Sequence, residues 1–463
     1  MSDQPIDPAV EAYLASTAAD RLERLLAFVR IPSISSLPEH APAMRDAASW
    51  LAGELGRIGA TDVEVASTPL HPIVTGRIHE SPGAPTVLVY CHYDVQPVDP
   101  LELWETEPFA PFVRDGRIVG RGSADDKGQL VMHLAAVEAI RAVHGRLPVN
   151  LTFLFEGEEE FGSESLFAWL EPNRERLAAD FALISDTGFF EGNLPAVTVG
   201  LRGIMYAQID VTGSPVDLHS GGYGGMVENP ANALARIITG LKGADGRVRI
   251  PGFYDDVVEL TAEERAAIAA LPFDEAEFRA AHAVGELVGE AGYTPLERRG
   301  ARPTLDVNGL WGGFQGHGAK TIIPAHAHAK VSTRLVADQD PEAVFAALRD
   351  YVAEIAPPGV RVEVTYIHGG RPSLTPVDHP ATRAAARALA AVFGREPVYI
   401  REGGSIPVTS GFDHVLGLPV VLLGFAQPGA NAHAPNEWLA LDNFERGTRA
   451  IVRLWDEVAA GRP

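Results

Sequence analysis

The sequence is poor in cysteine: Cys91 is the only one among 463 residues. A single cysteine cannot form an intrachain disulfide, and it cannot supply the thiolates of a cysteine-based zinc site. Any metal that the chain binds must therefore be held by histidine, aspartate and glutamate.

Basic residues are also scarce, with 38 Lys and Arg against 61 Asp and Glu and a formal net charge of −23. Proteins bind nucleic acid by neutralising phosphates with Lys and Arg, so this balance argues against a nucleic-acid partner. We assign most of the negative charge to a solvated surface, which does not by itself indicate a function.

Long apolar runs are absent as well. The longest, such as residues 419–425, have the length of a strand and fall far short of the roughly 20 residues that a membrane span needs. The sequence opens with polar and acidic residues rather than with the basic and then apolar order of a signal peptide. We therefore expect a cytoplasmic protein with no membrane partner.

Three short, dense apolar runs at 86–90, 149–155 and 181–184 are typical of buried strands. Stretches with helical apolar spacing, such as 18–29 and 128–143, alternate with these runs. This alternation predicts an α/β fold in which helices cover both faces of a mainly parallel sheet.

The length of the chain and a change in its pattern of expected strands and helices predict two domains. Residues 1–200 and 371–463 share the α/β pattern, and we assign them to one domain. Residues 201–370 resemble two β-α-β halves, which suggests an inserted ferredoxin-like α+β domain. Within this insert, the helical and charged segment 251–303 has no assigned place.

Histidine and acidic side chains follow the apolar runs at the point where each run ends. Open α/β sheets bind ligands outside the carboxyl ends of their strands, so we expect these groups to converge. One histidine or one glutamate run is more often structural or solvated, but the mixed set suits zinc, cobalt or manganese. The residues are His92 and Asp94 after the first run, 156–160 after the second, Asp186 after the third, and His433 after a fourth run at 420–425.

A glycine-rich turn at 120–128 adds two adjacent carboxylates, Asp125 and Asp126, at the start of a predicted helix. In an apolar site these charges would repel each other unless a cation or another partner offset them. The turn is therefore a fifth candidate element of the same site.

Nine short motifs, in this order along the chain, resemble a known family. The family is that of the co-catalytic zinc peptidases, which includes aminoacylase, carnosine dipeptidase and glutamate carboxypeptidase, and the sequence is most similar to its cytosolic carnosine-type dipeptidase branch. The motifs are CHYDVQP (91–97), GRGSADDKG (120–128), FEGEEEFGSE (155–164), ISDTG (184–188), GLRG (200–203), DLHSGGYGG (217–225), KTIIPA (320–325), GGSIPV (403–408) and AHAPNE (432–437).

The resemblance implies two zinc ions per subunit, with manganese or cobalt as alternatives. By this resemblance His92 and Asp186 hold one ion, Glu160 and His433 hold the other, and Asp125 bridges the two. Two such ions can share a water and clamp both reacting oxygens of a substrate.

The resemblance also gives roles to two further carboxylates. Asp94 would orient the imidazole of His92 and raise its basicity. Glu159 would act as the general base that takes a proton from water and delivers it to the leaving amine. The peptide bond between Asp125 and Asp126 is expected to be cis.

The register of the glutamate run leaves one alternative open. Family members read Glu-Gly-x-Glu-Glu-x-Gly-Ser, which makes Glu159 and Glu160 the functional pair. Because the x position here is Glu158, a slip of one residue would make Glu158 and Glu159 the pair instead.

For substrate binding, the resemblance implies that Arg334 grips a carboxylate, a task suited to a bidentate guanidinium. The backbone of Gly404 and the side chain of Ser405 would help to hold the same carboxylate, and Thr321 would add a hydrogen bond. His219 would reach across a dimer interface into the neighbour's active site. Each residue also has an ordinary structural interpretation. Arg334 could be a surface charge and Gly404 and Ser405 part of a plain turn. Thr321 could be a structural strand residue and His219 an ordinary loop histidine.

We predict metal-dependent hydrolysis of the amide bond of dipeptides or similar small peptides. The resemblance makes 1–200 and 371–463 the catalytic domain and 201–370 a lid and dimerisation domain of a homodimer. Asp186 favours the dipeptidase and aminopeptidase branches, because deacylases and carboxypeptidases tend to have Glu there. The alternatives are an N-acyl amino acid deacylase or carboxypeptidase of the same family, and a silent peptide- or metal-binding protein, which would lack a ligand or the base.

Overall fold

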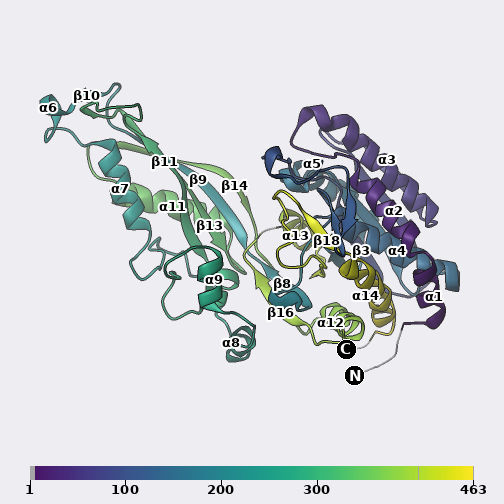
Figure 1. Ribbon diagram of the computed structural model, residues 1–463. Helices are drawn as coiled ribbons and strands as arrows, with labels where there is room; N and C mark the ends of the chain where they lie inside the picture. The colour runs from purple at the N-terminus through teal and green to yellow at the C-terminus, as the bar shows by residue number, and fades with distance from the viewer. Residues whose placement is uncertain (1–5, 405, 462–463) are drawn as a thin grey trace. The chain divides into compact units, whose positions relative to one another are not determined.

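The computed structural model describes residues 6–404 and 406–461 (Figure 1). The chain divides into two compact units. The first comprises Met1–Val199, Thr375–Ile400 and Ile406–Pro463, and the second comprises Gly200–Leu374 and Arg401–Ser405. None of the described helices has the length and apolar character that a membrane-spanning helix requires.

The first unit is built around a mixed sheet with the strand order β1-β2-β6-β3-β7-β17-β8-β15, in which β16 also pairs with β8. The central strands β6, β3, β7 and β17 are parallel to one another, and antiparallel pairs lie toward the edges. This confirms the predicted mainly parallel sheet. The strands are β1 (Thr61–Ala66), β2 (Ile73–Ile78), β3 (Thr86–His92), β6 (Asn150–Glu156), β7 (Phe181–Ile184), β8 (Ala196–Leu201), β15 (Ser373–Leu374), β16 (Val398–Glu402) and β17 (Val420–Leu422).

Helices cover both faces of this sheet. Val89 and Cys91 of β3 belong to the same buried apolar cluster as α4, whereas the ring of Tyr90 packs edge-to-face against Phe412 of the short π-helix after α13. The main helices are α1 (Pro8–Ser16), α2 (Ala18–Val29), α3 (Ala41–Arg57), α4 (Lys127–His144), α5 (Glu164–Leu170), α12 (Pro380–Phe393), α13 (Pro407–Gly411) and α14 (Leu441–Ala459). Because α4 packs against α1, α2 and α14, it is buried on nearly every side.

A small antiparallel sheet in the first unit joins distant parts of the sequence. β18 (Trp438–Ala440) pairs with β5 (Arg117–Val119), which pairs in turn with β4 (Phe112–Arg114). The loop before β18 is thereby placed next to the glycine-rich turn that follows β5.

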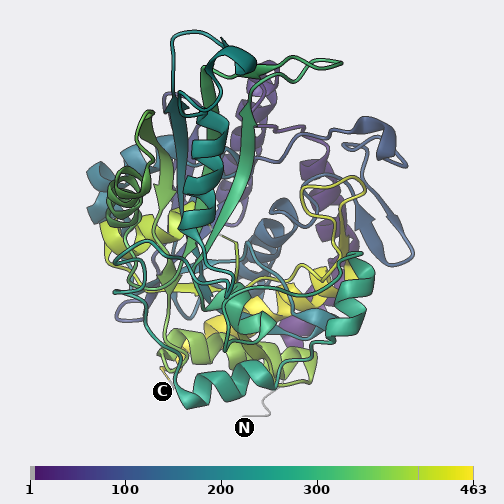
Figure 2. The same ribbon diagram turned by 90° about the vertical axis from the view of Figure 1, so that its left-hand side faces the viewer.

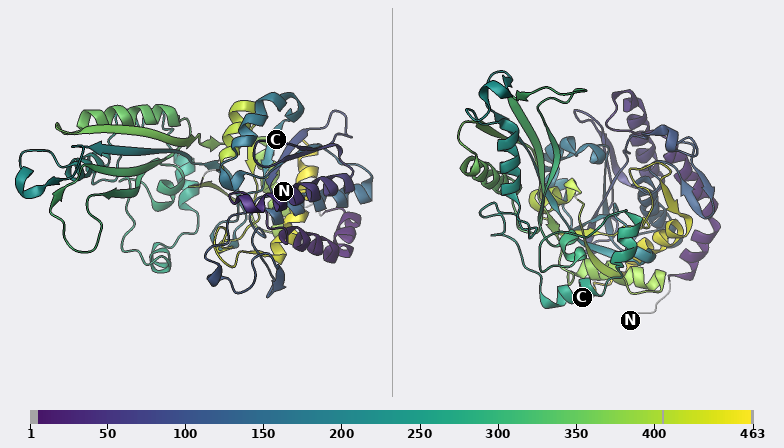
Figure 3. Two further views of the ribbon diagram at one scale, coloured as in Figure 1. Left: turned by 90° about the horizontal axis from the view of Figure 1, so that it is seen from above. Right: turned by 60° about the vertical axis from the view of Figure 1, so that its left-hand side comes forward.

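The second unit has a four-stranded antiparallel sheet in the order β11-β13-β9-β14. The four strands and the two helices that pack on them run β-α-β-β-α-β along the chain, which is the predicted ferredoxin-like arrangement. Alternate residues of β9 are buried because α7 and α11 pack on one face of the sheet (Figures 2 and 3). The elements are β9 (Gly203–Thr212), α7 (Pro230–Leu241), β11 (Thr304–Gly312), β13 (His326–Leu335), α11 (Pro341–Ile355) and β14 (Arg361–Gly370).

The segment 251–303, which had no predicted place, forms α8 (Ala262–Ala269), α9 (Glu275–Ala281) and α10 (Pro295–Gly300) between α7 and β11. Arg302 at its end is buried and donates two hydrogen bonds to Glu290, at 2.8 and 2.9 Å. The Arg302 guanidinium also lies 4.2 Å from the ring centre of Tyr293. These contacts join the end of the segment to residues earlier within it.

Candidate metal centre

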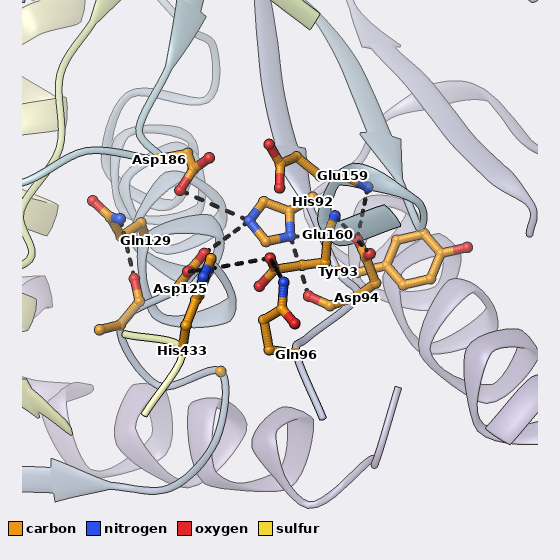
Figure 4. A network of polar contacts seen from close by, with 12 residues as sticks. His92, Tyr93, Asp94, Gln96, Asp125, Gln129, Glu159, Glu160, Asp186 and His433 are labelled. Atoms are coloured by element: carbon orange, nitrogen blue, oxygen red, sulfur yellow. Dashed lines mark hydrogen bonds and ion pairs between the residues drawn. The ribbon is translucent and has the colours of Figure 1, made fainter. Parts of the chain in front are cut away.

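Six of the predicted site residues converge in the first unit (Figure 4). His92 is the last residue of β3, the two glutamates follow β6, and Asp186 follows β7, so the carboxyl ends of parallel strands supply most of the groups. Their donor atoms form two sets, and within each set all lie within 4.8 Å of one another. The sets are His92, Glu159 and Asp186, and Asp125, Glu160 and His433.

Asp125 lies between the two histidines. Its Oδ1 is 3.0 Å from Nε2 of His92, and its Oδ2 is 2.9 Å from Nε2 of His433. Nε2 of His433 is also 3.1 Å from Oε2 of Glu160, and Nε2 of His92 is 3.8 Å from Oδ1 of Asp186. The two oxygens of Asp125 therefore face two different imidazoles, as a bridging ligand requires.

The electrostatics of the centre fit bound cations. Burial, and then the charge of Asp125, raises the pKa of Asp186 to about 7. Burial and neighbouring carboxylates also raise the pKa values of Glu159 and Glu160. A buried cluster of repelling carboxylates with two imidazoles is the oxygen and nitrogen donor set that borderline divalent metals prefer. The Asp125–Asp126 peptide bond is cis, as the resemblance implied.

The glutamate run has a geometry that favours the register in which Glu159 and Glu160 are the functional pair. The carboxylate of Glu158 is buried and accepts hydrogen bonds from the backbone N–H groups of His71, at 2.9 Å, and Ser165, at 3.0 Å. Glu158 thus holds the chain together, while the next two carboxylates join the two donor sets.

Gly157 allows this run to approach β3 closely. A Cβ atom at Gly157 would lie 2.5 Å from Cζ of Tyr93, and real Cβ atoms essentially never come so close to another atom. The phenol of Tyr93 is fixed in place because it donates a 2.5 Å hydrogen bond to the carbonyl of Pro72. A side chain at position 157 would therefore displace the residues that follow it.

The carboxylate of Asp94 holds the turn that carries Glu159 and Glu160. Its Oδ1 accepts from the backbone N–H of Glu159 at 3.2 Å, and its Oδ2 accepts from that of Glu160 at 3.1 Å. A third hydrogen bond comes from Oγ of Ser35 at 2.7 Å. Nδ1 of His92 lies 3.1 Å from the main-chain oxygen of Asp94 and 3.4 Å from its carboxylate, so both groups can orient the ring.

Two further side chains at the centre were not assigned roles from the sequence. Nε2 of Gln96 donates to Oε2 of Glu160 at 2.7 Å. Gln129 donates to the carbonyl of Ala124 at 3.1 Å and accepts from the backbone N–H of Phe425 at 2.6 Å, which links the Asp125 turn to the loop after β17. Gln96 lies within a motif, and Gln129 directly follows one; neither position alone reveals a partner.

Apart from Asp94, the other predicted site residues belong to the second unit, or lie outside the described residues in the case of Ser405. His219 ends the short strand β10 (Leu218–His219), which pairs with β12 (Ile322–Ile323), and its side chain is exposed. The carbonyl of Thr321 accepts a hydrogen bond from Ser220 at 3.1 Å, which closes the same loop pair. Gly404 lies in the turn after β16.

Arg334, in β13, has a second guanidinium nearby that was not assigned a role from the sequence. Burial, and then the charge of Arg334, lowers the pKa of Arg202 to about 10. Burial also lowers the pKa of Arg334 itself. The negative charge of Asp306 acts in the opposite direction on the pKa values of both arginines.

His133 of α4 gives a prediction about stability. It is buried, Nε2 lies 2.7 Å from Oγ of Ser185, and burial lowers its pKa to about 3. The unfolded chain takes up this proton below about pH 6.5, whereas the folded chain does so only near pH 3, so folding loses stability as the pH falls through that window. The slope contributed by His133 is about 1.4 kcal/mol per pH unit.

His133→Gln should therefore flatten the acid side of the stability curve. The measurement is the urea unfolding midpoint of metal-free protein at pH 7, 6, 5 and 4. His144→Gln changes an exposed histidine of the same helix and should leave the curve unaltered. Parallel curves for the wild type and His133→Gln would contradict the prediction.

Comparisons with known proteins agree with this geometry. A family model described as peptidase family M20/M25/M40 matches residues 88–457. The Cys-Gly metallodipeptidase dug1 of Schizosaccharomyces pombe is 34% identical over 455 residues, covering 95% of this chain and 96% of that protein. The Beta-Ala-His dipeptidase of Homo sapiens is 31% identical over 451 residues, covering 96% of this chain and 84% of the human protein.

Solved structures show the same fold. The M20 family metallo-carboxypeptidase Sso-CP2 of Sulfolobus solfataricus superposes with a TM-score of 0.84 at 33% identity, covering 95% of this chain and 99% of that one. Likeness of this extent spans both units. The chain belongs to the peptidase family M20/M25/M40.

Proposed function

We propose that the protein is a metallodipeptidase that hydrolyses the amide bond of dipeptides or similarly small peptides. One observation carries the proposal: Asp125 lies between two donor sets, with its two oxygens facing the imidazoles of His92 and His433, beside the buried carboxylate of Glu159. The names of two relatives, a Cys-Gly metallodipeptidase and a Beta-Ala-His dipeptidase, support small dipeptides as substrates.

The donor sets fit two divalent ions, which we take to be zinc, with manganese or cobalt as alternatives. His92 and Asp186 would hold one ion, Glu160 and His433 the other, and Asp125 would bridge them. Such a pair supplies Lewis-acid chemistry, in which the scissile carbonyl is polarised and the pKa of a shared water is lowered.

Glu159 would move the proton. Its carboxylate takes a proton from the attacking water and passes it to the nitrogen of the leaving amine, which completes the hydrolysis. Burial raises the pKa of this carboxyl group, which brings it closer to the operating pH of a general base. The hydrogen bond from its backbone N–H to Asp94 fixes its position, and Asp94 also orients His92.

Substrate binding would depend on the second unit. Arg334 would bind the carboxylate of the peptide as a bidentate donor, assisted by Gly404, Ser405 and Thr321. The positive charge of Arg202 near Arg334 supports an anionic ligand at this place.

We also propose a cytoplasmic homodimer that is joined through residues 201–370, with His219 reaching the partner's centre. Nδ1 of His219 accepts a 2.9 Å hydrogen bond from the N–H of Gly221, so a neutral ring carries its proton on Nε2 and can donate from there. Exposed apolar side chains of Val216, Tyr223 and Met226 in the same stretch are typical of an interaction surface.

A panel assay tests the proposed function. Metal-loaded protein is given a dipeptide, its N-acetylated form, and the tripeptide that extends it at the N-terminus. We expect the highest kcat/KM for the dipeptide with the free amine. Release of acetate from the N-acetylated form would indicate a deacylase. Release of the last residue of the tripeptide would indicate the second candidate, a carboxypeptidase, which the structural likeness to Sso-CP2 favours. No hydrolysis of any substrate at full metal loading would contradict all of these activities.

A further inference from the structure

A buried carboxylate that has no assigned role holds the turn carrying Asp125. The side chain of Glu437 is 0% exposed and that of Arg121 is 1% exposed. Oε2 of Glu437 accepts from Nη1 of Arg121 at 2.8 Å and from the N–H of Gly122 at 2.9 Å. Oε1 accepts from the N–H groups of Ala124 at 2.9 Å and Asp125 at 3.1 Å. Four donors therefore converge on one side chain.

The same residue belongs to the loop that carries His433. The main-chain oxygen of Glu437 accepts from the N–H of Gly120 at 3.0 Å, and the pairing of β18 with β5 begins at the next residue. Both the side chain and the main chain of Glu437 therefore join the loop that carries His433 to the turn that carries Asp125. Where they meet, Oδ2 of Asp125 lies 2.9 Å from Nε2 of His433, although more than 300 residues separate the two in sequence.

We propose that Glu437 is a positioning residue for the metal pair and acts through Asp125 and His433. Buried backbone N–H groups need a hydrogen-bond acceptor. The turn at 121–125 therefore keeps its shape only while the Glu437 carboxylate accepts from its N–H groups. A turn that is already in shape needs no reorganisation when ions bind, and fixed groups behind the ligands commonly strengthen metal binding by about 10–100-fold. The inference rests on the proposed function.

Glu437→Gln isolates this effect because it preserves the size of the side chain. The amide has one acceptor oxygen and one NH₂ group, and the NH₂ group would face donors that the carboxylate now accepts from. The variant therefore loses one of the two oxygens that accept these hydrogen bonds, together with the negative charge that faces Arg121.

The test measures zinc affinity directly, by competition with a chromophoric chelator, and independently of turnover. Glu437→Gln should bind at least one of the two ions about 10–100-fold more weakly. Zinc should also raise the melting temperature of the variant less than that of the wild type, because stabilisation by a ligand follows its affinity.

Glu457→Gln is the matched control. Glu457 lies in α14, is 2% exposed, and pairs with Arg387 at 2.7 Å and with Arg453. Its loss should lower the stability of the metal-free protein and leave zinc affinity unchanged. An equal loss of affinity in both variants would overturn the proposal, because the effect would then be general destabilisation.

Unchanged zinc affinity in folded Glu437→Gln would also overturn the proposal while leaving the proposed function intact. A wild type that binds no zinc, manganese or cobalt would overturn both. If Glu437→Gln does not fold, Glu437→Asp decides, since it keeps the charge but reaches fewer donors. Its affinity should lie below that of the wild type, and equal affinity would contradict the inference.

Discussion

Glu159→Gln is expected to lower turnover by about 10²–10⁴-fold, the usual contribution of a general acid–base group. The amide cannot take a proton from water or return one to the leaving amine. Both metal ions should remain bound, because the five assigned ligands are unchanged. The measurements are kcat on the preferred dipeptide and metal content by elemental analysis, with chelator-treated wild type as the inactive baseline.

Glu158→Gln is the control for this prediction and tests the register of the run. Glu158 accepts hydrogen bonds from the backbone of His71 and Ser165, so its replacement should lower stability and leave most of the turnover. Collapse of activity in Glu158→Gln with retained activity in Glu159→Gln would show that the assigned register is wrong by one residue. Full activity of the wild type without bound metal would contradict the two-ion mechanism itself.

His219→Ala is expected to lower turnover by about 10²–10³-fold, the cost commonly seen when one donor to a developing oxyanion is removed. The donor would be Nε2–H, because Nδ1 already accepts from Gly221. Metal content should not change, because His219 belongs to neither donor set. The assay compares kcat and metal content of the variant with those of the wild type.

Mixing His219→Ala with Glu159→Gln shows whether His219 acts across a dimer. A heterodimer would contain one centre with an intact Glu159 and a His219 from the other chain, so part of the activity should return. The two variants serve as each other's control, since each homodimer alone remains weak. No recovery despite demonstrated subunit exchange would argue against donation in trans, and a fully active monomer would exclude it.

The sequence predicted the parts of the fold that repeat a regular pattern. The runs 86–90, 149–155 and 181–184 became β3, β6 and β7 with shifts of at most two residues, because strands buried on both faces are apolar throughout. β11 was missed. It is an edge strand with many exposed residues, and its pairing shifts register between Val307 and Gly309, so alternation is lost there.

At the candidate site, the resemblance located the residues that converge, and their hydrogen-bond partners came only from the fold. Glu437 was noted as part of a motif, but its contacts with Arg121 and with the N–H groups of Gly122, Ala124 and Asp125 span more than 300 residues of sequence. The same holds for the carboxylate of Asp94, whose amide partners lie more than 60 residues away. Periodicity is a local property and gives no information about such pairs.

The position of β17 has a consequence for how the chain folds as it is synthesised. β17 (Val420–Leu422) lies between β7 and β8 in the first sheet, so β7 has no neighbour on that side until most of the chain has left the ribosome. By then β9 to β14 are complete, and domains tend to fold as units in the order of their synthesis. The second unit would fold first, and a chain truncated before Val420 would expose the edge of β7 as a template for aggregation.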